Sequence, residues 1–431
     1  MMRTHRAYIG LLVAPAIFAG LLFVTGAWAA TQETILHSFR PSAIPPGLHA
    51  GTNDGYEPLY VNLIMDEAGN LYGTTAGGGI FGYGTVFKLT RTGDFWTEAV
   101  VYAFGHTQAN GEGPVGGLIF DAAGNLYGTT RDGGDYNDGT VYELVHNADG
   151  TWTEKVLHSF NDTDGAGPYT PLIFDTAGNL YSTTQVGGAY NSGTAFELTP
   201  TGGGDWTEQV LHSFGYDTDG MYPTAPLVFD AAGNLYGTTG YGGEYQSGGT
   251  VFKLSPTMGG GWTEQVLHSF GSGVDGREPY AGGLIFDSFG NLYGTTAYGG
   301  INVCGEGSGN CGTVYELMPT GGGNWTEQVL YNFTDNFNDG HFPTSSLLFD
   351  GAGNLYGTTL YGGGRNNAGT VFKLTPAGGG WTEQLLYSFT GTNGDGTNPG
   401  GGLIPDGAGN LYGATFGGGA YDGGTVYEIA P

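Results

Sequence analysis

The stretch Asp164–Thr184 reads DGAGPYTPLIFDTAGNLYSTT, and DGMYPTAPLVFDAAGNLYGTT repeats it with small changes from Asp219 to Thr239. The segment D-x-x-G-N-L-Y within it occurs seven times, at intervals of 54 to 63 residues. Its first residues are Asp66, Asp121, Asp175, Asp230, Asp287, Asp350 and Asp406. Repeats of this length are typical of propellers and solenoids.

Each repeat contains four strand-like pieces, which in the fourth copy are APLVFD, NLYGTT, GGTVFKLSP and WTEQVLHSF. Runs of Val, Leu, Phe, Tyr and Thr between Gly, Asp and Asn indicate short strands joined by tight turns. The 87 glycines do not indicate collagen or disorder, because the chain has no G-X-Y period and is 14% aromatic. Four antiparallel strands per repeat predict one propeller blade each.

The two ends of the chain complement each other. The seventh copy stops after GTVYEIAP and lacks its fourth strand, whereas QETILHSF at Gln32–Phe39 matches TEQVLHSF and precedes the first copy. A ring uses such an arrangement to close, and closure hides two strand edges. We therefore predict an all-β fold, a single monomeric seven-bladed propeller over residues 30–431, with the N-terminal strand completing the last blade.

The N-terminus has the pattern of an export signal. Arg3 and Arg6 precede an apolar run from Tyr8 to Val24, and Ala27-Trp28-Ala29 offers small residues for cleavage before Ala30. We predict a signal peptide over residues 1–29, with an uncleaved membrane anchor as the alternative. The protein is then secreted, attached to the cell surface or periplasmic. In such an oxidising compartment, Cys304 and Cys311 are expected to form a local disulfide.

The net charge of the chain argues against anionic partners. The net charge is -29, with 40 acidic and 11 basic residues. Nucleic acid and anionic membrane surfaces need a basic footprint, so neither is expected as a partner.

Most repeat residues have expected structural roles. The Asp of D-x-x-G-N should cap its turn, with the Gly at positive φ. A Trp opens each outer strand and should pack between blades, at Trp96, Trp152, Trp206, Trp262, Trp325 and Trp381. A Glu follows two residues later and should lie exposed, where it discourages edge pairing, at Glu98, Glu154, Glu208, Glu264, Glu327 and Glu383.

The motifs LIFDAAGNLYGTT, GTVYEL and WTEQVLHSF resemble the GloVer tandem-repeat family of exported bacterial proteins over essentially the whole mature chain. The family is also known as choice-of-anchor, because its members combine the repeats with differing C-terminal sorting tails. The resemblance implies an extracellular or cell-surface role and no defined reaction. Nothing follows the last strand at Pro431, so we expect free secretion or a periplasmic location rather than anchoring. Glycine pairs before an aromatic residue and Trp also resemble kelch repeats distantly, which implies the same architecture.

The candidate binding residues lie in two loop types that should share one face of the propeller. The loops from an outer strand to the next blade carry D-G-x-x-P, and their acidic or amide residues are Asp54, Asn110, Asp164, Asp219, Asp275, Asp339 and Asp395. The loops between the second and third strands carry G-G-x-Tyr in several blades, at Tyr136, Tyr190, Tyr245 and Tyr421. A rim of carboxylates and tyrosines around a central depression would suit sugar rings. The structural alternative is that Asp-Gly forms turns and Pro fixes the start of the next strand.

No motif is specific to an enzyme. A phosphate loop, a dinucleotide fingerprint, H-E-x-x-H and a multi-Cys metal pattern are absent from the sequence. The segments NDTDG and YDTDG resemble half a calcium loop, but Pro171 or Pro226 stands where an EF-hand has its Glu. We predict no cofactor and no metal ligands, and a weak non-EF calcium site is the alternative.

Histidines fall into two groups. A shared position in the outer strand holds His37, His158, His212 and His268, which we interpret as repeat residues. The loop-face residues that occur once are His49, His106, His341 and Arg277. Two insertions break the symmetry on the same face, at residues 40–53 and around the cysteine pair.

These observations favour a non-enzymatic binding or surface-interaction propeller, with a glycan or a cell-surface protein as its partner on the loop face. The alternative is an extracellular polysaccharide lyase or glycoside hydrolase with its site in the central depression.

Overall fold

The computed structural model describes residues 32–41, 54–60, 62–107, 109–304, 310–336 and 338–430. Residues Thr31–Pro431 form one compact unit. The predicted signal peptide and most of the insertion at residues 40–53, with His49, lie outside the described residues. Within the described ranges, no helix is long and apolar enough to cross a membrane.

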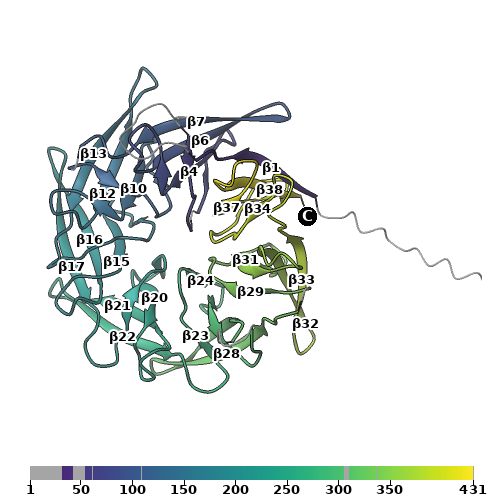
Figure 1. Ribbon diagram of the computed structural model, residues 1–431. Coiled ribbons are helices and arrows are strands. Elements are labelled where there is room, and N and C mark those ends of the chain that lie inside the picture. Colours follow the sequence, from purple (N-terminus) through teal and green to yellow (C-terminus); the bar gives the residue numbers. More distant parts are fainter. Residues whose placement is uncertain are drawn as a thin grey trace, which may run out of the picture. The chain divides into compact units, whose positions relative to one another are not determined.

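Seven antiparallel sheets make up this unit, and Figure 1 shows them arranged as a ring. From inner to outer strand, blade 1 consists of β3 (Ile64–Met65), β4 (Leu71–Thr75), β6 (Thr85–Thr92) and β7 (Phe95–Ala103). Blade 2 consists of β9 (Ile119–Phe120), β10 (Leu126–Thr130), β12 (Thr140–His146) and β13 (Trp152–Ser159). Blade 3 consists of β14 (Ile173–Phe174), β15 (Leu180–Thr184), β16 (Thr194–Gly202) and β17 (Asp205–Ser213).

The remaining blades follow the same order. Blade 4 consists of β19 (Val228–Phe229), β20 (Leu235–Tyr241), β21 (Thr250–Pro256) and β22 (Trp262–Ser269). Blade 5 consists of β24 (Ile285–Phe286), β25 (Leu292–Thr296), β27 (Thr313–Gly321) and β28 (Asn324–Asn332). Blade 6 consists of β30 (Leu348–Phe349), β31 (Leu355–Gly362), β32 (Thr370–Ala377) and β33 (Gly380–Ser388). Blade 7 consists of β35 (Ile404–Pro405), β36 (Leu411–Thr415), β38 (Thr425–Ala430) and β1 (Gln32–Ser38).

The ring closes through β1, as predicted. This strand pairs antiparallel with β38, from Gln32 opposite Ala430 to Ser38 opposite Thr425. Figure 1 shows the purple β1 beside the yellow β38. The seven-bladed propeller predicted from the repeats and the complementary ends is therefore confirmed.

The core consists of seven apolar clusters, one between each pair of neighbouring blades. Successive side chains of the third strand point to opposite faces of the blade, so they pack alternately against its two neighbouring blades. In β6, Phe87 and Leu89 pack towards blade 7, whereas Val86 packs towards blade 2. The predicted role of the tryptophans is also confirmed, because the Trp206 ring of blade 3 lies edge-on 6.4 Å from Tyr127 of blade 2.

The Asp of D-x-x-G-N caps its turn as predicted. In blade 1, Asp66 Oδ1 accepts hydrogen bonds from the backbone N–H groups of Ala68 and Asn70, at 3.0 and 2.9 Å. The intervening Gly69 has a φ of 80°. Side-chain donors from Asn70 and Tyr72 satisfy the other oxygen.

The inner strand differs from the prediction of one continuous piece. In blade 4 only Val228 and Phe229 of APLVFD join the sheet, and Met221–Pro223 upstream (β18) pairs separately with the far end of β20. The corresponding residues of blades 7 and 1 contact each other, because the Gly402 N–H of blade 7 donates to Asn62 Oδ1 of blade 1 at 2.7 Å.

Candidate functional site

Each blade carries a short ladder on the loop face, between the residues after Asp-Gly and the residues after its second strand; we call these the mouth ladders. Six of them are β2 (Gly55–Tyr56) with β5 (Gly77–Gly78), β8 (Gly111–Glu112) with β11 (Asp132–Gly133), β18 with β20, β23 (Gly276–Arg277) with β26 (Tyr298–Gly299), β29 (Gly340–Pro343) with β31, and β34 (Gly396–Thr397) with β37 (Gly417–Gly418). Blade 3 has a single bridge between Ala166 and Val186. The repeat thus builds the same platform seven times.

Only one pair of side chains in each mouth ladder is free to vary. The glycine after Asp is required, because a Cβ on Gly276 would lie 2.3 Å from the side chain of Thr296, and equivalent contacts occur in the other blades. The other pair differs in every blade: Tyr56 and Gly77, Glu112 and Asp132, Ala166 and Val186, Met221 and Tyr241, Arg277 and Tyr298, His341 and Tyr361, Thr397 and Gly417. The side chains that each blade presents on this face are therefore different.

The residue before the proline of each mouth segment adopts positive φ, even where it is not glycine. The φ values are 57° at Glu57, 58° at Tyr222, 55° at Glu278, 64° at Phe342 and 58° at Asn398. Such a conformation costs about 1 kcal/mol for a residue with a side chain. Hydrogen bonds between blades hold it in place.

In blade 5, the Glu278 N–H donates to Gly248 O of blade 4 at 2.7 Å, and Glu278 O accepts from Ala297 N at 2.9 Å. The backbone of Glu278 therefore connects neighbouring blades at the mouth of the ring. The same hydrogen bonds hold its Cα, and thus the base of its side chain, in a fixed position.

Five tyrosines from four blades gather here, and we call them the central tyrosine patch: Tyr60, Tyr241, Tyr280, Tyr298 and Tyr361. Tyr60 of blade 1 reaches Tyr280 of blade 5, with ring centroids 6.1 Å apart and edge to face. Gly400 of blade 7 makes room for this, because a Cβ there would lie 2.9 Å from the Tyr60 ring.

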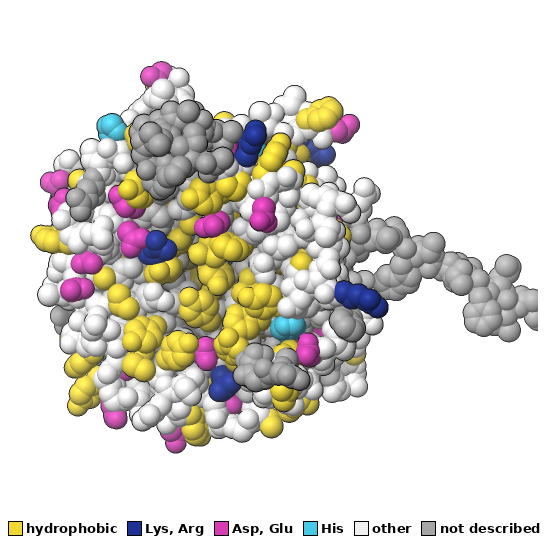
Figure 2. Space-filling model, in the orientation of Figure 1, with side chains coloured by type: hydrophobic (Ala, Val, Ile, Leu, Met, Phe, Trp, Pro, Cys, Tyr) yellow, Lys and Arg dark blue, Asp and Glu magenta, His cyan; other side chains and the backbone are white. Residues whose placement is uncertain are grey.

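Further aromatic side chains extend the patch over blades 4 to 6. The Phe342 ring lies 4.6 Å from Tyr298 and 5.7 Å from Tyr361. The His341 ring is tilted by 32° to Tyr361, at 5.8 Å. Figure 2 shows hydrophobic side chains gathered across the centre of the ring, with acidic, basic and histidine side chains at the margin.

Burial shifts the pKa values of the ionisable groups of the patch towards the neutral forms. Burial, followed by the neighbouring tyrosines, raises the pKa of Tyr60 to about 12. Burial raises the pKa of Glu278, against a hydrogen bond from Tyr241 and the charge of Arg277. Burial also lowers the pKa of His341. The patch presents mainly aromatic faces and hydroxyl groups, with Arg277 and Glu278 beside them.

Blade 2 contributes the most polar part of the mouth. Glu112 and Asp132 are opposite each other in the ladder, and Arg131 Nε donates to Asp132 Oδ2 at 2.6 Å. Burial and then the charge of Asp132 raise the pKa of Glu112.

The predicted carboxylates do not surround this mouth. Each lies at a junction between blades, together with a His or Tyr of one outer strand and a Glu of the next; we call these the junction triads. They are His37–Asp54–Glu98, Tyr102–Asn110–Glu154, His158–Asp164–Glu208, His212–Asp219–Glu264, His268–Asp275–Glu327, Tyr331–Asp339–Glu383 and Tyr387–Asp395–Glu33.

The Asp or Asn of each junction triad also closes its own loop. Asp219 Oδ1 accepts from the Gly215 N–H at 3.0 Å, and Asp275 Oδ1 accepts from the Gly271 N–H at 3.0 Å. These bonds agree with the structural alternative for D-G-x-x-P, in which Asp-Gly forms a turn.

The glutamates of the outer strands were predicted to be exposed, and this prediction is wrong. Each is half-buried, and one oxygen of each is shielded from solvent with no hydrogen-bond partner among the described residues: Glu33, Glu98, Glu154, Glu208, Glu264, Glu327 and Glu383. Burial and then the charge of Asp54 raise the pKa of Glu98 to about 7, although His37 opposes the shift. The alternation of residues along one strand cannot predict this burial, because the residues that shield each glutamate belong to the neighbouring blade.

The predicted tyrosines lie exposed beside the junction triads rather than at the mouth. The Tyr190 ring lies 5.5 Å from the Tyr216 ring at a tilt of 38°, and both line a 610 Å³ cavity with His212, Asp219 and Glu264. A second cavity of 620 Å³ is lined by Tyr421, Arg40, His37, Asp54 and Glu98. The structure thus unites predicted Asp and Tyr residues in pockets around the outside of the ring.

The loop-face residues that occur once separate into two groups. His341 and Arg277 belong to neighbouring mouth ladders in blades 6 and 5, beside the central tyrosine patch. His106 is exposed and contacts Phe81 with ring centroids 5.2 Å apart. Sequence analysis did not identify the patch tyrosines, although Tyr at the second position after GTT in three consecutive blades was a usable signal.

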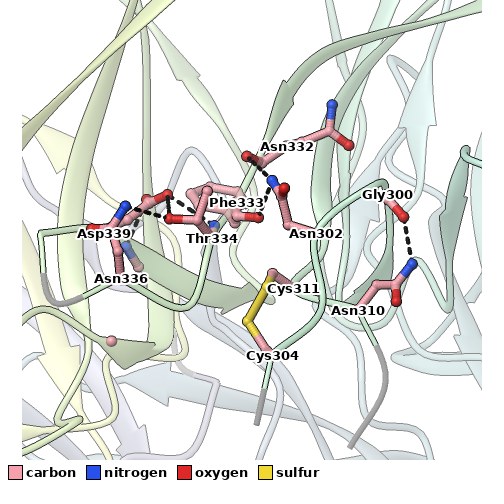
Figure 3. Close-up of a disulfide and its surroundings, with 12 residues drawn as sticks. Gly300, Asn302, Cys304, Asn310, Cys311, Asn332, Phe333, Thr334, Asn336 and Asp339 are labelled. Atoms are coloured by element: carbon pink, nitrogen blue, oxygen red, sulfur yellow. Dashed lines mark hydrogen bonds between the residues drawn. A yellow bond between two sulfur atoms is a disulfide. The ribbon is translucent and has the colours of Figure 1, made fainter.

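The disulfide predicted between Cys304 and Cys311 is present in blade 5, with Cα atoms 5.1 Å apart. Figure 3 shows Asn302 beside it, donating from Nδ2 to the carbonyls of Asn332 and Phe333 at 3.2 and 3.0 Å. These bonds tie the enlarged loop to the outer strand of its own blade.

The chain is similar to two solved structures. The extracellular domain of a one-component system from B. thetaiotaomicron aligns with a TM-score of 0.51 at 15% identity, covering 92% of this chain and 42% of that one. At this identity the match shows the fold alone. A protein from Thermus thermophilus described as an oxidoreductase (glucose dehydrogenase) aligns with a TM-score of 0.43 at 17% identity, covering 74% of this chain and 96% of that one.

A search of curated proteins gave no significant match. The family model described as the Gloeobacter/Verrucomicrobia repeat matches residues 36–153, 145–306 and 303–431. These three matches together span the ring, which confirms the resemblance seen in the repeat motifs, and the chain belongs to the Gloeobacter/Verrucomicrobia repeat family.

Proposed function

We propose that the protein is an exported binding module that takes a carbohydrate at the central tyrosine patch. The observation that carries this proposal is the contrast between scaffold and mouth: the blades repeat closely, whereas the mouth ladders differ in every blade and bring tyrosines of blades 1, 4, 5 and 6 together. A purely structural mouth has no need of such variation.

The chemistry of the patch suits an uncharged, hydroxyl-rich ligand. Tyrosine faces stack on the C–H surfaces of sugar rings, and their hydroxyls exchange hydrogen bonds with those of the sugar. Glu278 adds an acceptor beside Tyr241. A net charge of -29 repels anionic ligands at long range, so a neutral glycan is favoured over an acidic one.

Export rests on independent features. The N-terminal residues have the pattern of a cleaved signal, and a disulfide joins Cys304 to Cys311. Structural disulfides persist in oxidising compartments. We place the protein outside the cytoplasm as a monomer that is secreted, periplasmic or held at the cell surface, with a glycan or a glycosylated surface protein as its partner.

One observation favours an enzyme as the second candidate. Glu112 and Asp132 face each other across a mouth ladder, and the pKa of Glu112 is raised by burial and by Asp132. A pair of carboxyl groups supplies the usual acid and base of glycoside cleavage, and a raised pKa suits the acid.

A glycan array probed with the mature protein, with and without calcium, tests the proposal, and each hit is incubated with the protein and analysed for products. Binding without turnover is the expected result. Cleaved product would replace the binding role by the enzyme, and loss of binding with a chelator would place calcium in the site. An array without any hit would contradict carbohydrate binding.

A further inference from the structure

The junction triad between blades 7 and 1 has the geometry of a cation site. His37, Asp54 and Glu98 each offer one ligand atom, a ring nitrogen or a carboxylate oxygen. These three atoms all lie within 4.8 Å of one another. His37 Nε2 lies 3.4 Å from both Asp54 oxygens. Two ligand atoms about 2.1 Å from a tetrahedral zinc ion are separated by about 3.4 Å.

Glu98 completes this triad with an oxygen that lacks a partner. Its Oε1 is shielded from solvent and accepts no hydrogen bond from the described residues. Burying a carboxylate oxygen without a donor costs free energy that a hydrogen bond or a cation would recover.

The junction between blades 4 and 5 differs from this site in geometry. His268 Nε2, Asp275 Oδ2 and Glu327 Oε1 are all shielded, and none has a hydrogen-bond partner within the described part of the ring. His268 Nε2 lies 3.4 Å from Asp275 Oδ2, but the ligand atoms of this triad do not all lie within 4.8 Å of one another. Among the described residues, the His37 triad is therefore the junction triad whose three ligand atoms can reach one cation.

Three junctions of the same chain have Tyr in place of His. The Tyr hydroxyl donates to a carboxylate: Tyr102 to Glu154 at 2.9 Å, Tyr331 to Asp339 at 3.0 Å and Tyr387 to Asp395 at 3.3 Å. One oxygen of each glutamate at these junctions still lacks a partner among the described residues. A phenol brings its own proton, whereas a neutral imidazole can offer a lone pair at Nε2, so a Tyr junction lacks the nitrogen ligand that His37 provides.

We propose that the His37–Asp54–Glu98 junction triad binds a transition-metal dication of the zinc type, which joins the outer strands of blades 7 and 1. One imidazole and two carboxylates suit Zn²⁺ or Mn²⁺, whereas Ca²⁺ prefers oxygen ligands alone. A dication also cancels the charge of the two carboxylates. The triad borders a cavity of 620 Å³, which leaves room for a water molecule as the fourth ligand.

The test measures metal bound per chain. Protein stripped with a chelator is exposed to Zn²⁺, desalted and analysed by mass spectrometry of the metal, and its Tm is recorded with and without Zn²⁺. The expected stoichiometry is one Zn²⁺ per chain, with a rise in Tm. His37→Tyr should abolish the uptake, and His268→Tyr should leave it unchanged.

The chain supplies its own controls. Tyr is native at the His position in three blades, so His37→Tyr should leave the metal-free Tm unchanged, and His106→Tyr should leave both stoichiometry and Tm unchanged. Absence of Zn²⁺ uptake would overturn the proposal. Uptake that is the same in His37→Tyr as in the wild type would also overturn it, because the ions would then be held by acidic residues elsewhere.

Discussion

Asp66 illustrates how a single side chain fixes a turn that recurs around the ring. Burial raises its pKa, but hydrogen bonds from Asn70 and Tyr72 and the nearby charge of Lys88 outweigh burial, so the pKa is lowered overall. The pKa is lowered in the same way, with burial opposing the hydrogen bonds, at Asp175, Asp230, Asp350 and Asp406. Each of these charged carboxylates therefore stabilises the folded chain.

The turn aspartates predict a loss of stability in acid. A folded pKa below the unfolded value means that the contribution is present above about pH 3.8 and is lost as the pH falls through the folded pKa. The Tm should therefore fall steeply below about pH 4. Asp350→Asn removes one contributor and should flatten this fall; an acid limb identical to that of the wild type would contradict the assignment.

Gly276 predicts a local steric effect in the mouth scaffold. In Gly276→Ala the new Cβ would lie 2.3 Å from the buried Thr296 side chain. Overpacking of this kind costs about 1–3 kcal/mol, measurable by denaturant unfolding. The matched control is Gly407→Ala, because Gly407 has open space around its Cα and the equivalent positions hold Ala122 and Ala231. Equal stability of the two variants would show that the mouth segment moves freely.

Sequence alone could identify residues with local roles, and it could not identify those with partners in another blade. The turn aspartates and the tryptophans follow from their own strand and turn. Glu98 meets His37 and Asp54 only because blade 7 lies beside blade 1, so its burial depends on ring geometry. Tyr60 and Tyr280 are 220 positions apart in sequence and touch across the mouth.

At the scale of elements, β1 closes the ring by pairing with β38. It supplies the outer edge of blade 7, and Leu36 on it belongs to the core between blades 7 and 1. A chain that begins at Phe39 should therefore have a lower Tm and aggregate through the bared edge of β38. A chain that begins at Gln32 is the control, and the peptide QETILHS should restore the Tm of the shorter chain. Unchanged melting without β1 would contradict closure.

The disulfide predicts a separate effect on the loop of blade 5. It joins cysteines separated by seven positions, and closing so short a loop contributes about 2 kcal/mol. A reductant should therefore lower the Tm of the wild type. The Cys304→Ser/Cys311→Ser variant should have that lower Tm and not respond to reductant; a wild-type Tm insensitive to reduction would contradict a stabilising role.

The inner strands mark the limit of pattern-based prediction. APLVFD has the composition of a strand, but only Val228 and Phe229 of it pair with β20, and pairing resumes upstream at Met221–Pro223. The proline of D-G-x-x-P lacks an N–H, and the residue before it turns to positive φ to reach the neighbouring blade. The split strand that results creates the mouth ladders.

At the scale of the whole molecule, the fold separates a repeated scaffold from a variable face. Repeat counting was sufficient for blade number and closure, since both depend on residues that recur. The candidate site consists of the residues that do not recur, and their grouping emerges only when the ring brings blades 1, 4, 5 and 6 together. The predicted rim of Asp and Tyr instead formed pockets on the outside.

The most direct test compares the mouth with this outer rim as the place of ligand binding. Calorimetric titration with the strongest glycan from the array would be repeated for Tyr298→Ala and Tyr361→Ala at the mouth and for Tyr136→Ala and Tyr190→Ala at the rim. Losing one stacking ring at the mouth should weaken binding at least about tenfold, equivalent to about 1.4 kcal/mol, with Tm unchanged. The rim variants should bind like the wild type. Full affinity in both mouth variants, or loss confined to the rim variants, would contradict a binding site at the central tyrosine patch.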